Sequence, residues 1–161
     1  MQQHDSQQLA PHAPGIDWSA TRQHATKQRA SIQREVLRLL DDLAPERPPP
    51  RHEAPSTAVR AYRWPSRCIL QGESHAISVS WFPGGVDDGS LGEMMVIAWD
   101  GVVSLPGSGR RIAEQAQAVR SLLLHPEETS GGGWEWRSEQ GATAFGTAAL
   151  AMYCREQLER S

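Results

Sequence analysis

Proline occupies five of the eleven positions from 45 to 55, and this run divides the chain into two parts that fold differently. A proline ring blocks the interior of a helix and removes a hydrogen-bond donor from a sheet, so no regular element can run through such a segment. We therefore predict a stiff, extended connector over residues 45–56. The parts on either side of it have different hydrophobic periods.

The part before the connector has the period of a helix. Its apolar side chains recur at the spacing of one helical stripe, and Asp17 or Ser19 can cap its start. The stripe consists of Ile32, Val36, Leu39, Leu40 and Leu43. We predict a helix over residues 17–44. All residues of its stripe except Leu40 are candidate partner contacts, and the alternative is that the stripe packs on the helix's own domain. Residues 1–16 hold little to bury, and we expect a disordered arm there.

A companion stripe on the same segment is polar. It consists of Gln28, Glu35 and Asp42, at intervals of seven residues. A coiled coil needs apolar side chains at both of its heptad positions, so the segment is not predicted to form a coiled-coil seam.

After the connector the pattern changes to that of strands. Residues 77–81 alternate between apolar side chains and serine, as in a strand with one polar face. Residues 94–99 are continuously apolar, which is typical of a strand covered on both sides. Asp100–Gly101 lies between two apolar runs and predicts a hairpin that returns over residues 102–105.

Two helices are predicted to follow the strands. The first has one face made of Ile112, Ala116, Val119 and Leu123, and ends at His125–Pro126. The second runs from Glu139 to Arg160 and buries Ala142, Phe145, Ala149, Met152 and Tyr153. Residues 57–161 are therefore predicted to form an α+β domain, in which two C-terminal helices pack on one face of an antiparallel sheet of three to five strands.

This order of elements resembles that of the small acidic chaperones of bacterial secretion systems. The resemblance rests on the order of elements alone, because no motif is shared, and the proline-rich connector departs from that family. It implies a chaperone-like or adaptor-like protein.

Composition excludes several classes of protein. The net charge is −3, whereas a general nucleic-acid binder needs a basic surface, so no nucleic-acid partner is expected. No apolar run reaches the roughly 18 residues of a membrane span, and the first residues lack the pattern of a secretory signal. Cys68 and Cys154 are too far apart for a zinc motif or a disulfide framework. We expect a cytoplasmic protein without a metal or another cofactor.

The turn Gly107–Arg111 is the candidate anion site. A strand, a glycine-containing turn and the start of a helix would bring free backbone N–H groups together beside two arginines. The candidate ligands are Ser108, Gly109, Arg110 and Arg111. The alternative is an ordinary turn capped by Ser108, since the Walker and dinucleotide motifs are both missing.

Two further candidates are weaker. The acidic loop over residues 86–93 could offer oxygen ligands to a cation, but it lacks the pattern of an EF-hand loop. His75 and Cys154 could form a catalytic pair only if they approach each other and the thiol ionises readily. We expect His75 at a strand end and Cys154 in the core, so no catalytic residue is predicted.

Six tryptophans against two phenylalanines and two tyrosines are an unusual ratio. Trp64, Trp134 and Trp136 lie beside a proline or a glycine run, at expected sheet edges, and exposed indoles often anchor interfaces. Packing inside the domain is the alternative for Trp134 and Trp136, which a short strand would place on one side.

The leading hypothesis is a non-catalytic protein–protein interaction module, an accessory subunit that binds another protein or a second copy of itself. The alternative is a small enzyme or ligand-binding domain that contacts an anionic ligand through Gly107–Arg111.

Overall fold

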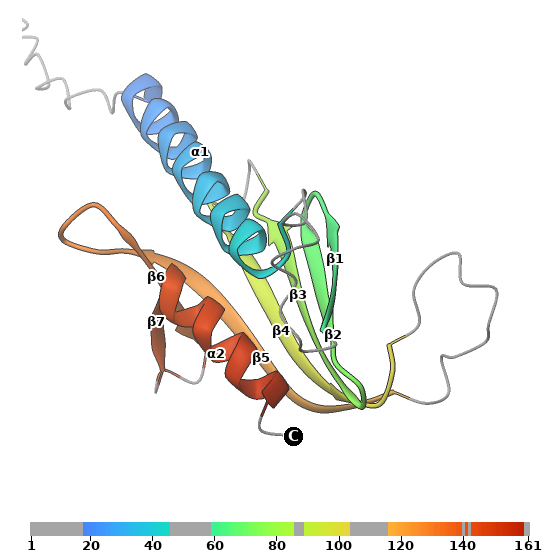
Figure 1. Ribbon diagram of the computed structural model, residues 1–161. Coiled ribbons are helices and arrows are strands. Elements are labelled where there is room, and N and C mark those ends of the chain that lie inside the picture. Colours follow the sequence, from blue (N-terminus) through green and yellow to red (C-terminus); the bar gives the residue numbers. More distant parts are fainter. Residues whose placement is uncertain are drawn as a thin grey trace, which may run out of the picture.

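The computed structural model describes residues 18–45, 59–85, 89–103, 116–139, 141 and 143–159. Along the chain, helix α1 (Trp18–Leu43) comes first, seven strands follow it, and helix α2 (Thr147–Glu159) comes last (Figure 1). The strands are β1 (Arg60–Trp64), β2 (Arg67–Gln71), β3 (His75–Pro83), β4 (Gly92–Asp100), β5 (Gln117–Glu128), β6 (Trp134–Ser138) and β7 (Ala144–Gly146).

The seven strands form one antiparallel sheet in which each strand pairs with the next one along the chain. Both helices pack on the same face of this sheet, which we call the inner face (Figure 1). The opposite side is the outer face. No helix in the described part of the chain lies on it.

The core lies between the inner face and the two helices. α1 contributes its apolar stripe, and α2 contributes Leu150, Ala151 and Cys154. Alternate residues of the strands complete the core, namely Cys68, Leu70, Ile77, Val79, Trp81, Met94, Val96, Leu124, Trp134 and Trp136. Successive side chains of a strand point to opposite faces, so the residues between these belong to the outer face.

The prediction of a first C-terminal helix over residues 112–125 is wrong where the structure describes this segment, because residues 117–128 form β5. Leu122 and Leu124 pack on the inner face while Leu123 lies on the outer face, so three consecutive leucines suit a strand as well as a helix. The segment forms a strand, not a helix, because it pairs with the edge of the apolar strand β4. Pro126 lies beyond the residues that pair with β4, where the missing N–H is tolerated.

The second C-terminal helix is shorter than predicted, because residues 144–146 form β7 and the helix begins at Thr147. Its buried face also differs, since Met152 is 60% exposed while Leu150 and Ala151 are buried. The sheet therefore has seven strands and is followed by a single helix, in place of three to five strands followed by two helices. This order of elements also removes the basis for the resemblance to the secretion chaperones.

The predicted hairpin after β4 is also different. Gly101 adopts a positive φ of 101° after Asp100, but Val102 and Val103 do not belong to a strand. β4 pairs with β5 instead, and the N–H of Val103 donates to the side-chain oxygen of Gln71.

Several other predictions lie outside the described residues, among them the arm over residues 1–16 and the connector from residue 46 onward. Neither described helix has a stretch of apolar residues long enough to span a lipid bilayer.

Candidate functional site

The helical stripe predicted as a partner contact lies in the core of this chain. Ile32, Val36, Leu39 and Leu43 are at most 5% exposed and pack against the inner face. Of the two alternatives for α1, the structure has the helix packed on its own domain.

Trp134 and Trp136 point to the inner face from β6, with exposed fractions of 8% and 0%. The indole of Trp136 meets that of Trp81 edge to face, with ring centroids 5.9 Å apart. Its N–H donates to the hydroxyl of Thr147 over 3.2 Å, and this hydroxyl donates to the carboxylate of Glu35 over 2.8 Å. β6, α2 and α1 are thus joined by a polar chain at the edge of the core.

The polar stripe of α1 lies along the seam with β5, β6 and α2. Gln28 donates to the carboxylate of Glu128 over 3.0 Å, and Glu35 accepts from Thr147. The backbone carbonyl of Asp42 accepts a hydrogen bond from Arg155 of α2. All three positions of the stripe therefore contact a neighbouring element.

Trp64 is the one predicted partner contact that reaches the surface. It is partly buried at the end of β1, and the guanidinium of Arg67 lies 5.8 Å from its ring centroid. β1 pairs with β2 on one side only, so Trp64 lies on an edge strand of the sheet.

The predicted anion site, Ser108 to Arg111, lies outside the described residues, as do residues 86–88 of the acidic loop. Within the described part of the chain, no three His, Cys, Asp or Glu side chains gather as metal ligands would.

The two residues considered as a catalytic pair, His75 and Cys154, lie in different environments. The imidazole Nδ1 of His75 lies 2.8 Å from the hydroxyl of Ser74, and its Nε2 lies 3.5 Å from a carboxylate oxygen of Asp100. Cys154 is fully buried, on the side of α2 that packs into the core. Burial raises the pKa of the Cys154 thiol to about 12, and the nearby Cys68 adds to this shift. A thiol with such a pKa is a poor nucleophile at neutral pH.

We expect a thiol reagent at about pH 8 to modify neither cysteine of the folded protein and both after denaturation. Burial likewise raises the pKa of the Cys68 thiol to about 12. Unfolded thiols ionise near pH 9, so the free energy of unfolding should fall as the pH rises from about 9 towards 12. Rapid modification of the folded protein, followed by absorbance, would contradict the burial of both thiols.

The outer face carries apolar side chains, of which Trp64 alone was predicted as a partner contact. The strand register places these side chains on β1, β2, β4 and β5, and the outer-face serines of β3, Ser78 and Ser80, lie between them. We call this set the outer patch; it consists of the partly exposed Tyr62, Trp64, Met95, Ile97, Trp99 and Leu123 and of Ile69, which is buried among the residues of this face at 2% exposed. The indole N–H of Trp99 donates to the hydroxyl of Ser78, 2.9 Å away, between the apolar rows. Next to the patch, Phe82 is 52% exposed at the end of β3.

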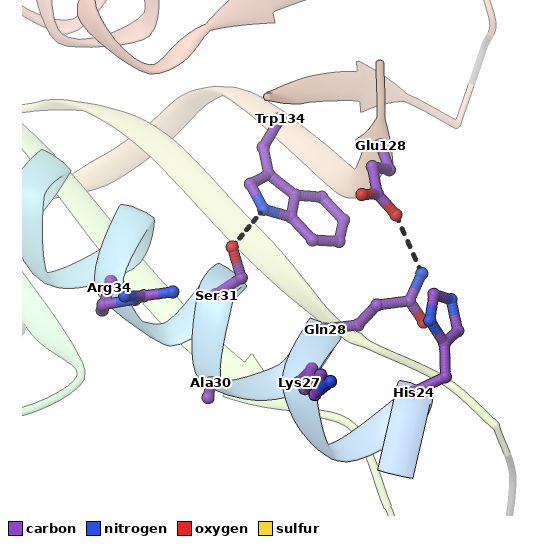
Figure 2. Close-up of a pocket in the computed structure, with 8 residues that line it drawn as sticks. All are labelled: His24, Lys27, Gln28, Ala30, Ser31, Arg34, Glu128 and Trp134. Carbon is purple, nitrogen blue, oxygen red and sulfur yellow. Dashed lines mark hydrogen bonds between the residues drawn. The ribbon is translucent and has the colours of Figure 1, made fainter. Parts of the chain in front are cut away.

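A second surface feature is a cleft of about 450 Å³ between α1 and the hairpin of β5 and β6 (Figure 2). We call it the α1 cleft; it is lined by His24, Lys27, Gln28, Ala30, Ser31, Arg34, Glu128 and Trp134. The indole N–H of Trp134 donates to the hydroxyl of Ser31 over 3.0 Å, and the Gln28–Glu128 hydrogen bond spans the same gap (Figure 2). These two bonds connect the walls of the cleft.

Comparison of the chain with models of protein families, with curated proteins and with solved structures finds no match.

Proposed function

We propose that this chain is a non-catalytic protein–protein interaction module, an accessory subunit of a larger assembly, and that it binds its partner through the outer patch. The observation that carries this proposal is the run of partly exposed apolar side chains along β4, Met95, Ile97 and Trp99, on a sheet face that no described helix covers. An antiparallel sheet with one solvated face normally alternates apolar and polar residues, and β4 does not.

The chemistry of the outer patch fits another protein. Arg67 is the charged side chain within its central rows, and it lies against Trp64. Charged side chains gather instead on the neighbouring part of the outer face, where Arg137 pairs with Glu127 and Glu135. An apolar centre beside a charged rim is the composition of a protein interface.

Two further features support a binding role over a catalytic one. The thiol of Cys154 is buried and protonated at neutral pH. Both ring nitrogens of His75 face groups near the start of β3, Ser74 and Asp100. Because both cysteines are free thiols, we assign the protein to a reducing compartment, the cytoplasm.

The substitution Met95→Lys tests the outer patch. Met95 lies in the middle of its row between Ser80 and Leu123, so a lysine there places a charge inside the interface. A partner that binds through this face should lose about tenfold or more in affinity, because a buried unpaired charge is costly. The free chain should fold as before, since the lysine can extend its ammonium into water.

The matched control is Met152→Lys, which places the same charge on α2, where Met152 is 60% exposed. Captures from a lysate with the wild type and both variants are compared by mass spectrometry, and light scattering reports the oligomeric state. A partner kept by Met152→Lys and lost by Met95→Lys supports the proposal. A dimer that only Met95→Lys dissociates identifies a second copy as the partner. Unchanged capture and unchanged mass with Met95→Lys would overturn the proposal.

A further inference from the structure

We propose that the α1 cleft binds an extended acidic segment of another polypeptide. This site lies on the helix side of the sheet and is independent of the outer patch. The proposal rests on the charge of α1, on the lack of partners for its cations, and on the geometry of the cleft.

The N-terminal portion of α1 is basic in an acidic chain. Residues 18–34 contain four cations, Arg22, Lys27, Arg29 and Arg34, and no carboxylate, whereas the whole chain has a net charge of −3. The first turns of α1 extend beyond the strands, and the side chains of residues 21–24 are exposed (Figure 1). A positive surface attracts anionic partners and raises the rate at which they bind.

The cations of the α1 cleft lack carboxylate partners within the described part of the chain. Lys27 and Arg34 are exposed and form no ion pair with a described residue. Glu128 on the opposite wall accepts its hydrogen bond from Gln28. Lys27 and Arg34 outnumber the carboxylate of Glu128 in the lining, which leaves a net charge of +1 that a bound carboxylate could neutralise.

The framework that holds these cations is fixed on both sides of α1. The Ser31–Trp134 hydrogen bond attaches the helix to the hairpin of β5 and β6. On another side, the guanidinium of Arg29 donates to the carbonyl of Gly85, 2.5 Å away. These bonds hold the backbone of α1 in place, so a ligand would have to order only the side chains of Lys27 and Arg34.

The spacing of the cations fits an extended chain. Lys27 and Arg34 are seven positions apart, which corresponds to about 10 Å along a helix. An extended peptide advances about 3.3 Å per residue, so acidic side chains two or three residues apart can reach both cations. A single phosphate cannot bridge that distance.

The cleft is less suited to a nucleic acid, which is the other extended polyanion. Proteins that bind single strands without sequence preference use exposed aromatic faces on which the bases stack. Trp134 is 8% exposed with its N–H bound to Ser31, which leaves the imidazole of His24 as the exposed ring in the lining, too few for a run of stacked bases. The observations therefore favour an acidic peptide.

The test measures binding of a fluorescent peptide of alternating glutamate and serine by anisotropy, at low and at moderate salt. We expect saturable binding that weakens with salt and that falls about tenfold or more in the double variant Lys27→Glu with Arg34→Glu. The matched control is Arg22→Glu with Arg38→Glu, which makes the same change in net charge on the same helix outside the lining. Circular dichroism confirms that both variants remain folded.

Binding that the control retains and the cleft variant loses supports the proposal. An equal loss in both variants would overturn it in favour of net charge alone, and no binding of the wild type at millimolar peptide would overturn it as well. A labelled single-stranded oligonucleotide is the second probe, and tighter binding of the oligonucleotide than of the peptide would identify a nucleic acid, not an acidic peptide, as the ligand. Because Met95 lies outside the cleft, Met95→Lys should bind the peptide like the wild type, which separates this site from the outer patch.

Discussion

Replacing Trp136 by alanine is expected to lower the free energy of unfolding by about 3–5 kcal/mol, the range for a fully buried aromatic side chain. Trp136 is 0% exposed and packs edge to face against Trp81. The substitution also removes the N–H that donates to Thr147. Urea denaturation followed by circular dichroism measures the change.

Two further variants separate the contributions. Trp136→Phe keeps most of the apolar surface and loses the hydrogen bond to Thr147, so it should cost less than alanine. Trp64→Ala removes the same side chain from a partly exposed position on β1 and should also cost less. A loss below about 1 kcal/mol for Trp136→Ala would contradict the packing of β6 against α2.

α1 is the element that the sequence predicts best. Its apolar stripe has the helical period, and Pro45 follows its end. The polar stripe also carries information, since the side chains of Gln28 and Glu35 bond across a seam to another element, whereas Asp42 does so through its backbone carbonyl. Polar residues at a regular helical spacing beside an apolar stripe can thus indicate a second, polar contact surface.

β5 could not be predicted from its own residues, because its conformation depends on the edge of β4. The spacing of Val119 and Leu123 fits a helix, but Val119 is 59% exposed at a point where the register of β4 and β5 shifts. Strand pairing joins residues far apart in the chain, so local spacing is a weak guide to it. The start of α2 was missed for the same reason, because β7 forms by pairing with β6.

The outer patch has a sequence signal that becomes clear only with the topology. The continuous apolar run of β4 predicts a strand covered on both sides. The structure covers one side with α1 and α2, where Met94 and Val96 lie in the core. Met95 and Ile97 lie on the other side of β4. A bound partner would explain why these two residues are apolar.

Replacing Leu39 by alanine is expected to lower the free energy of unfolding by about 2–5 kcal/mol. Leu39 is 0% exposed in the core between α1 and the inner face of the sheet. The substitution removes apolar surface and leaves a cavity that rigid neighbours cannot fill, while alanine keeps the helix propensity high. Thermal and urea denaturation both report the change.

Leu37→Ala is the control, because it makes the same substitution two residues away on the same helix. Leu37 is 39% exposed and lies outside the core cluster, so its truncation should change the stability by about 1 kcal/mol or less. The difference between the two variants therefore measures the packing of α1 on its own sheet, since propensity and composition are matched. If Leu39→Ala were as mild as Leu37→Ala, α1 would be a separable arm whose stripe is free to bind a partner. A large difference means that a partner must use a surface other than the stripe, such as the outer patch or the α1 cleft.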